Sequence, residues 1–284
     1  MTIREALRRG AKQLRGHRCD GADPVREAEA LLASATGLSR ERMFMSPDLP
    51  LASGARRRFS SLVARRRRHA PLAYLLGTAW FAGLEFAVDR RVLIPRPATE
   101  HVLDTAVRAA VRTDAALVID VGTGSGCVAI AAAKALPGAR VLATDDSPAA
   151  LRLARSNARR RSARVRFLRG DLLRPASAAL TAARRPAVII ANLPYVPASS
   201  PVSPCVRREP RRAVFAPGDG TGPYRELFRQ LAAIPLRAPA TIVCELLPRQ
   251  YLPLDKAFRR LFPDARPERI KNHRGRTVGL IART

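Results

Sequence analysis

The segment ANLPYVP (191–197) directly follows the short apolar run AVII (187–190). Asn192 carries a hydrogen-bond acceptor and two donors on one planar group. Pro194 fixes its own φ and has no N–H, and Tyr195 offers a flat aromatic face. Together these residues could grip a planar NH2 group on an sp2 carbon, with a backbone carbonyl of Leu193 or Pro194 as a second acceptor. An ordinary turn after a buried strand would explain the same residues, so the segment needs support from elsewhere in the chain.

Three other apolar segments also end in residues that could bind a ligand. The segment DVGTGSG (120–126) ends the first, and its glycines let backbone N–H groups approach a ligand just before a helix. Asp145 ends the second and can accept hydrogen bonds from ribose hydroxyls, although Asp145-Asp146 could instead cap a helix, with Asp146 the better cap. Asp171 ends the third, where its carboxylate can reach an adenine amino group. No Lys-Ser/Thr pair follows the glycines, which argues against a phosphate-binding P-loop.

The order of the predicted elements explains why these positions matter together. From residue 115 onward, short apolar strands alternate with helices, the pattern of a parallel sheet covered by helices on both faces. Ligands of such sheets bind at the carboxyl ends of the strands. A glycine turn, two acids and an Asn at four successive strand ends therefore favour a nucleoside cofactor. The expected cofactor-binding residues are Gly122, Thr123, Gly124, Ser125, Gly126, Asp145, Asp171, Leu172 and Asn192.

The N-terminal part of the chain has a different character. Residues 1–72 are expected to form a small helical domain, with a helix that starts at Asp23-Pro24 and stops at Gly37, and another over 52–68. Residues 73–98 contain aromatics, glycines and an expected turn at Asp89-Arg90, which indicates a β-hairpin linker. Residues 99–284 form the expected catalytic domain, beginning with a helix over 99–112.

The charge of the chain is strongly positive, at +28, which favours polyanions such as ribosomal RNA. Only four of the 51 basic residues are Lys, so a coding bias toward Arg explains the charge equally well. Both explanations stay open, and we expect at most a weak association with RNA or the ribosome. The absence of long apolar runs and of a secretory leader leads us to expect a cytoplasmic protein without a membrane partner.

The four cysteines, Cys19, Cys127, Cys205 and Cys244, are scattered along the sequence without a CxxC pair. The four histidines, at positions 17, 69, 101 and 273, do not cluster with them. We therefore expect four reduced thiols and no metal site. No His is expected to act as a catalytic base.

The quoted motifs resemble those of the protein glutamine N5-methyltransferases. The resemblance covers residues 3–283 and includes DVGTGSG, NLPY, the segment YLLGTAWFAGLEFAVDRRVLIPRPATE (74–100) and REPRRAVFAPGDGTG (208–222). It implies a Rossmann-like α/β fold with a seven-stranded, mostly parallel sheet, and S-adenosyl-L-methionine as methyl donor. It further implies Asn192, Pro194 and Tyr195 as catalytic residues, which bind the substrate together with Leu193. The implied substrate is a peptide chain release factor, methylated at the glutamine of its Gly-Gly-Gln loop.

Two positions depart from the family pattern. Leu193 replaces the first Pro after the Asn, and Ala98 replaces a Glu. Adenine also carries an NH2 on an sp2 carbon, so an adenine N6-methyltransferase acting on ribosomal RNA or DNA remains an alternative. The ribosomal-protein branch of the glutamine methyltransferases is another. A non-enzymatic RNA-binding protein would leave the four strand ends unexplained.

Overall fold

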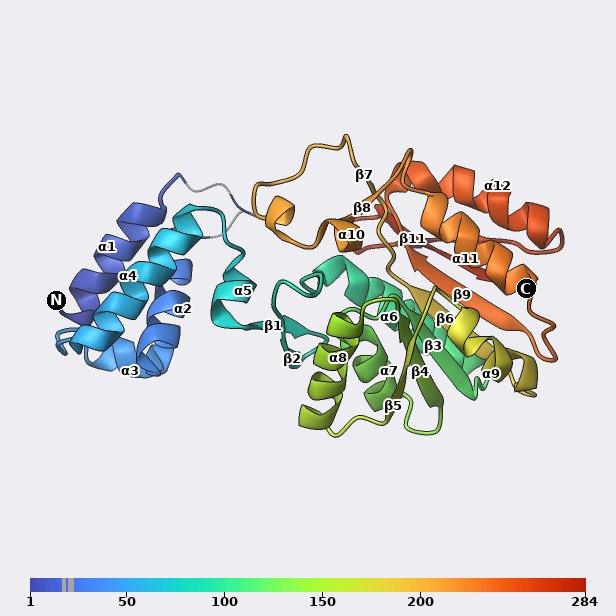
Figure 1. The fold of residues 1–284 in the computed structure, drawn as a ribbon, viewed down its shortest axis with the longest axis horizontal. Helices are drawn as coiled ribbons and strands as arrows, with labels where there is room; N and C mark the ends of the chain where they lie inside the picture. The colour runs from blue at the N-terminus through green and yellow to red at the C-terminus, as the bar shows by residue number, and fades with distance from the viewer. Residues whose placement is uncertain (17–18, 20–22) are drawn as a thin grey trace. The chain divides into compact units, whose positions relative to one another are not determined.

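The computed structural model describes residues 1–16, 19 and 23–284 (Figure 1). The chain divides into two compact units. The first contains residues 1–78 and 201–209, and the second contains residues 79–200 and 210–284. The sequence did not indicate that segment 201–209, deep inside the expected catalytic domain, packs with the N-terminal helices. No helix of the described residues is both long enough and apolar enough to span a bilayer.

The first unit is helical, as the sequence predicted. Its helices are α1 (Ile3–Leu14), α2 (Pro24–Thr36), α3 (Arg40–Met45), α4 (Ser53–Arg67) and α5 (Leu72–Leu76), followed much later by the short 3₁₀ helix η2 (Val206–Arg208). The Asp23 side chain accepts a hydrogen bond from the N–H of Val25, and Gly37 ends α2 in the left-handed conformation, as expected for such caps. Apolar side chains from α1, α2 and α4, including Ile3, Leu31 and Phe59, form its core.

The linker is a β-hairpin, and its two strands are joined at Ala82-Gly83. Strands β1 (Thr78–Phe81) and β2 (Leu84–Ala87) pair, and Ala82-Gly83 connects them with positive φ at both residues. Two-residue hairpin turns need that conformation because it matches the twist of the strands. The predicted turn at Asp89-Arg90 is also present, because the N–H of Val92 donates to the Asp89 carbonyl at 3.1 Å, but it follows β2 and does not join the strands. The Asp89 side chain pairs with Arg91.

The second unit contains a seven-stranded sheet with the order β10-β11-β9-β6-β3-β4-β5. Its strands are β3 (Leu117–Val121), β4 (Arg140–Asp145), β5 (Val165–Arg169), β6 (Ala187–Ala191), β9 (Ala240–Glu245), β10 (Glu268–Lys271) and β11 (Thr277–Arg283). Neighbours from β9 to β5 are parallel, and β11 is antiparallel to both β9 and β10. The predicted α/β fold is thus confirmed, although β10 was not anticipated. Two short strands outside this sheet, β7 (Val196–Pro197) and β8 (Phe215–Ala216), pair in parallel.

Helices cover both faces of the sheet (Figure 1). The helices of this unit are α6 (Pro97–Arg112), α7 (Cys127–Ala135), α8 (Pro148–Arg160), α9 (Ser177–Ala182), α10 (Arg211–Val214), α11 (Gly222–Ala232) and α12 (Tyr251–Leu261), with 3₁₀ turns η1 (Arg174–Ala176) and η3 (Pro248–Gln250). Ile119 packs with residues of α11 and α12, and its neighbour Val118 packs with residues of α6 and α7. All residues of β3 and β6 are buried, as expected for central strands of such a sheet.

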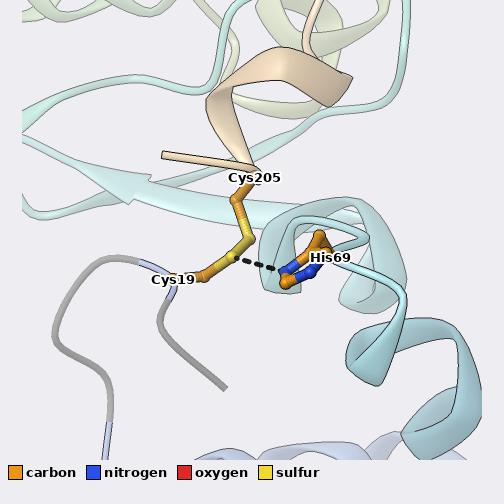
Figure 2. Close-up of side chains that lie close together, drawn as sticks. All are labelled: Cys19, His69 and Cys205. Atoms are coloured by element: carbon orange, nitrogen blue, oxygen red, sulfur yellow. Dashed lines mark hydrogen bonds between the residues drawn. A yellow bond between two sulfur atoms is a disulfide. The ribbon is translucent and has the colours of Figure 1, made fainter. Parts of the chain in front are cut away.

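The structure corrects the expectation of four reduced thiols. Cys19 and Cys205, 186 residues apart in the sequence, form a disulfide, and Cys127 and Cys244 are free and buried. The Nδ1 of His69 lies 3.6 Å from the Sγ of Cys19, so a histidine does lie beside a cysteine (Figure 2). The expectation failed because segment 201–209 returns to the helical unit, which spacing along the sequence cannot reveal. His17, also considered above, lies outside the described residues.

Candidate active site

One cavity of the second unit is bordered by the ends of the parallel strands. Parallel pairing places Val121 beside Thr144 and Ala191, so the residues after these positions share one edge of the sheet. The cavity lining includes most of the residues predicted from the sequence, namely Gly122, Thr123, Gly124, Ser125, Asp145, Asp171, Leu172, Asn192, Leu193 and Pro194. Gly126 and Tyr195 do not line it. The strand-end residues are therefore brought together at one cavity.

The glycine turn after β3 is held by the neighbouring strand. The N–H groups of Gly122 and Thr123 both donate to the carbonyl of Thr144 at the end of β4. Gly122 has a φ of 74°, and a Cβ there would lie 3.0 Å from the Cδ2 of Leu193. Gly126 packs against α8, where a Cβ would lie 3.0 Å from that of Ala154. Gly122 is thus required for the turn to lie against the segment after β6, while Gly126 serves helix packing.

Asp120 organises the inside of this turn and was not singled out from the sequence. Its Oδ2 accepts hydrogen bonds from the Thr123 hydroxyl at 2.6 Å and from the N–H of Ala129 at 3.1 Å. Burial raises the pKa of Asp120 to about 7, and these two bonds only partly offset that effect. An acid inside the otherwise apolar strand LVIDV was the signal that could have revealed it.

Asp145 is fixed by main-chain donors from both sides. Its Oδ1 accepts from the N–H of Ser147 at 2.8 Å, and its Oδ2 accepts from the N–H of Gly124 at 2.9 Å. Burial raises its pKa, and the two N–H bonds oppose this effect by favouring the charged form. The alternative cap role proposed for Asp146 is wrong, because the Ser147 hydroxyl caps α8 and Asp146 pairs with Arg212 at 2.5 Å.

The third strand end depends on a helix on the other side of the turn. Gln230 of α11 donates through Nε2 to Asp171 Oδ2 at 2.9 Å, and its Oε1 accepts from the N–H of Leu173 at 3.0 Å. Leu172, between them, has the unusual positive φ of 46°. The oxygen and the nitrogen of the Gln230 side-chain amide thus both hold the Asp171-Leu172 turn at the cavity. Gln230 could not be recognised from its own sequence context.

Asn192 is oriented by α6. Its Nδ2 donates to the hydroxyl of Thr99 at 3.0 Å, and Thr99 itself is buried. This bond fixes the plane of the Asn192 amide and therefore the direction of its Oδ1 acceptor. One of the two donors of the Asn192 NH2 group is thus taken up by Thr99.

Tyr195 follows the residues that line the cavity, and its side chain binds an acid at the end of β9. Its hydroxyl donates to Glu245 Oε1 at 2.9 Å. Burial raises the pKa of Glu245, and nearby Thr99 and Tyr195 lower it in part. The other carboxylate oxygen, Oε2, is buried without a hydrogen-bond partner among the described residues. The Tyr195 carbonyl accepts from Gln250 Nε2 at 2.7 Å, so both ends of this residue are anchored.

Both units of the chain contain segments that match known protein families. Residues 5–77 match the family described as PrmC N-terminal domain, and residues 118–203 match a methyltransferase domain. The release factor glutamine methyltransferase of Bacillus subtilis is 32% identical over 99% of this chain and 97% of its own. The chain belongs to the release factor glutamine methyltransferase family. The enzyme of the same name from Geobacter sulfurreducens is 42% identical over 70% of this chain and 69% of its own.

A solved structure supports the fold of this family member. The catalytic domain of human Mettl16, in complex with the MAT2A 3′UTR hairpin 1, matches with a TM-score of 0.54 at 14% identity, over 90% of each chain. At that identity the likeness shows the fold alone.

The methyl donor of this methyltransferase is S-adenosylmethionine, and the cavity fits it. Gly122 and Gly124 place no side chain in the turn, and Asp145 presents a carboxylate whose two oxygens are already positioned by backbone N–H groups. When bound, the donor supplies a methyl group on a positively charged sulfur, a strong electrophile.

Leu193 departs from the family pattern without leaving a buried donor unpaired. A Pro at this position would lack an N–H, whereas the N–H of Leu193 donates to the hydroxyl of Tyr224 at 3.2 Å. That hydroxyl in turn donates to the Glu245 carbonyl. Nothing in the structure explains Ala98, the other departure.

Asn157 of α8 supports the glycine turn of this methyltransferase, and the sequence did not indicate that role. Its amide exchanges two hydrogen bonds with the backbone of Ala87 in the hairpin, at 2.9 and 3.0 Å. It also donates to the Ser125 carbonyl at 2.9 Å. One buried side chain therefore joins the hairpin to the glycine turn. Its rarity as one of three Asn residues in the chain was the only available signal.

Proposed function

We propose that the protein transfers a methyl group from S-adenosylmethionine to the side-chain amide nitrogen (N5) of a glutamine in a peptide chain release factor. The observation that carries the proposal is the placement of Asn192, held by Thr99 at the cavity that the glycine turn and Asp145 also line. The names of the relatives indicate a release factor as the substrate to test and a glutamine as the methylated residue. We propose that this glutamine is the one in the Gly-Gly-Gln loop, as the resemblance implies.

The chemistry requires positioning more than activation. The lone pair of an amide nitrogen is delocalised into its carbonyl, so the nitrogen is a poor nucleophile. Asn192 Oδ1 accepts one N–H of the substrate amide, and the backbone carbonyl of Leu193 or Pro194 accepts the other. Acceptors that are fixed before the reaction favour a tetrahedral nitrogen, and alignment of this kind supplies roughly 7–11 kcal/mol in the best cases.

Tyr195 completes the substrate side through its fixed position rather than as a base. Burial and the neighbouring carboxylate of Glu245 raise the pKa of Tyr195, so its hydroxyl stays protonated and keeps donating to that carboxylate. The aromatic ring is thereby held for contact with the flat amide. A strong base is unnecessary because the methylated nitrogen is itself acidic.

The residues at the other strand ends bind the methyl donor. Asp145 accepts hydrogen bonds from the ribose hydroxyls, and Asp171 with Leu172 binds the adenine. The main chain of residues 122–126, including Thr123 and Ser125, lies along the donor. Because the substrate belongs to translation termination, we expect the enzyme in the cytoplasm. The charge of +28 supports a weak, salt-sensitive association with RNA or the ribosome.

The decisive experiment offers the purified protein several acceptors together with methyl-labelled S-adenosylmethionine. The acceptors are a release factor, its variant with the Gly-Gly-Gln glutamine replaced, ribosomal protein and ribosomal RNA. We expect label only in the intact release factor. Label in ribosomal RNA but not in the release factor would refute the proposal and support the adenine alternative, and label only in ribosomal protein would support the related branch.

The role of Asn192 is tested by Asn192→Ala. We expect turnover to fall by at least about 10²-fold, the loss typical for removal of one fixed transition-state contact. Calorimetry should show donor binding largely retained. The matched control is Asn272→Ala, in the turn between β10 and β11, which should keep wild-type turnover. Retained turnover in Asn192→Ala would contradict the assignment.

A further inference from the structure

A compact group of sulfur and nitrogen atoms lies in the helical unit and includes none of the residues assigned to methyl transfer. Figure 2 shows the ring of His69 turned toward the disulfide between Cys19 and Cys205. The Nδ1 of His69 lies 3.6 Å from the Sγ of Cys19, and the three ligand-type atoms all lie within 4.8 Å of one another. It is the only such group of His, Cys, Asp or Glu among the residues that the structure describes.

The surroundings hold this group in place. Both cysteines are 1% exposed, so their sulfurs are shielded from solvent. His69 follows α4 with a φ of 64°, a conformation that non-glycine residues adopt rarely and at a cost. A backbone bond from its N–H to the Arg66 carbonyl, 2.8 Å long, helps to hold this turn. The strained turn carries the imidazole toward the sulfurs.

Arg66 sets the charge at the sulfurs. Its Nη1 donates to Cys205 Sγ at 2.9 Å and to the Ala70 carbonyl at 3.0 Å, and its Nε and Nη2 pair with the carboxylate of Glu27. Arg66 and Glu27 are both buried, and their charges cancel. Two thiolates at Cys19 and Cys205 would therefore leave a net charge of about −2 in a buried place, which a divalent cation would neutralise.

We propose that the reduced form of this group is a metal site, in which Cys19, Cys205 and His69 bind a thiophilic divalent cation of the zinc class. Two thiolates and a neutral imidazole are the ligand types that zinc prefers. A dithiol reductant supplies two electrons and is itself oxidised to a disulfide, while Cys19 and Cys205 become thiols. Binding of the cation then releases one proton from each thiol, and water or an added thiol supplies the fourth ligand.

The site has a structural consequence inside the helical unit. Segment 201–209 is joined to the N-terminal helices by the disulfide, but thiols stay reduced in most cytoplasmic proteins. A metal bridge would preserve the same connection under reducing conditions, and the bond from Arg66 would stabilise the thiolate of Cys205. The proposal does not depend on the methyl-transfer activity and is tested without it.

The test titrates the whole wild-type protein with Co²⁺ and then Zn²⁺, after reduction, removal of bound metal by a chelator and transfer to anaerobic buffer. Alkylation and mass spectrometry confirm the thiol state. We expect one equivalent of Co²⁺ with the absorption of a tetrahedral, thiolate-bound ion, displaced by Zn²⁺ with sub-micromolar affinity. The same protein kept oxidised should show neither signal. This comparison needs no substitution, so it does not depend on a variant that folds.

Variants then assign the ligands. Cys19→Ser and Cys205→Ser should weaken binding by more than about 100-fold, beyond the 10–100-fold typical of outer-shell changes, and His69→Ala should shift the cobalt spectrum. The matched controls are Cys127→Ser, Cys244→Ser and His101→Ala, which should bind metal as the wild type does because none of these residues belongs to the group. Burial also raises the thiol pKa of Cys127 and Cys244, which disfavours the thiolate that a metal needs.

Three results would each overturn the proposal. The first is a reduced wild-type protein that binds less than stoichiometric metal, including one whose thiols simply re-form the disulfide. The second is binding that survives in Cys19→Ser and Cys205→Ser. The third is an unchanged cobalt spectrum in His69→Ala, which would remove the imidazole from the site.

Discussion

The bond between Thr99 and Asn192 makes a sharp prediction about catalysis. Thr99→Val keeps the shape of the side chain but removes the hydroxyl that accepts the Asn192 Nδ2 hydrogen bond at 3.0 Å. A neutral hydrogen bond of this kind contributes about 0.5–1.5 kcal/mol net. If loss of the bond misaligns the Asn192 acceptor and raises the activation free energy by that amount, kcat falls by roughly 2–10-fold.

The assay measures kcat with a saturating release factor and, separately, donor affinity by calorimetry. We expect Thr99→Val to lower kcat and to leave donor affinity within about twofold, since the lost bond orients a group assigned to the substrate. Thr105→Val is the matched control, because Thr105 lies on the same helix and its hydroxyl donates to the His101 carbonyl at 2.8 Å. That control loses a similar bond without touching Asn192.

The result that decides between orientation and general destabilisation is the double variant. If Thr99 acts through Asn192, then Thr99→Val should change nothing further in the Asn192→Ala background, and the coupling should be about 1 kcal/mol. Equal losses in both backgrounds, or an equal loss in Thr105→Val, would refute the reasoning.

Three further predictions concern the supports of the site. Gly220→Ala should destabilise the fold by several kcal/mol more than Gly218→Ala, because both glycines have positive φ but only a Cβ at Gly220 meets backbone, at 2.1 Å; equal shifts in chemical denaturation would contradict this. Tyr224→Phe should cost about 1–3 kcal/mol by orphaning the buried N–H of Leu193, and the cost should shrink in a Leu193→Pro background, whereas an unchanged cost would show that this N–H is unimportant. Burial raises the pKa of Asp120 to about 7 from 3.8, so the folded protein holds a proton that the unfolded chain releases. The contribution of Asp120 to stability should therefore be full below about pH 4 and decline toward pH 7, and melting temperatures across that range should lose this decline in Asp120→Asn; an equal decline in the variant would rule out Asp120 as its source.

The sheet and the cavity edge were predictable because their signals are local. Each parallel strand is a short apolar run, and alternation with helices specifies the architecture. Glycines after β3 and single acids after β4 and β5 then mark the ligand edge. Strand β10 was missed for the opposite reason, since ERIK carries charges at three of its four positions and has only one buried residue. An edge strand can remain polar because only one side of its backbone is paired.

The residues that orient the site were not predictable because each acts across a long stretch of chain. Thr99 reaches Asn192 over 93 positions, Asn157 reaches Ala87 over 70, and Gln230 reaches Asp171 over 59. Thr, Asn and Gln are ordinary residues on helices, and nothing in their own neighbourhood indicates a partner. Only the packing of α6, α8 and α11 beside the sheet determines which strand end each of them meets.

Leu193 shows how such distant partners decide what a local change means. By sequence alone, the loss of a Pro adds a backbone N–H to a buried segment, and an unpaired buried donor is costly. The Tyr224 hydroxyl removes this cost, because it accepts a hydrogen bond from the Leu193 N–H and donates one to the Glu245 carbonyl. The carboxylate of Glu245 in turn holds the hydroxyl of Tyr195. The substituted position is thus connected through β9 to the aromatic side chain two residues later, which is why the segment can depart from the family pattern at Leu193 and still hold Asn192 and Tyr195 in place.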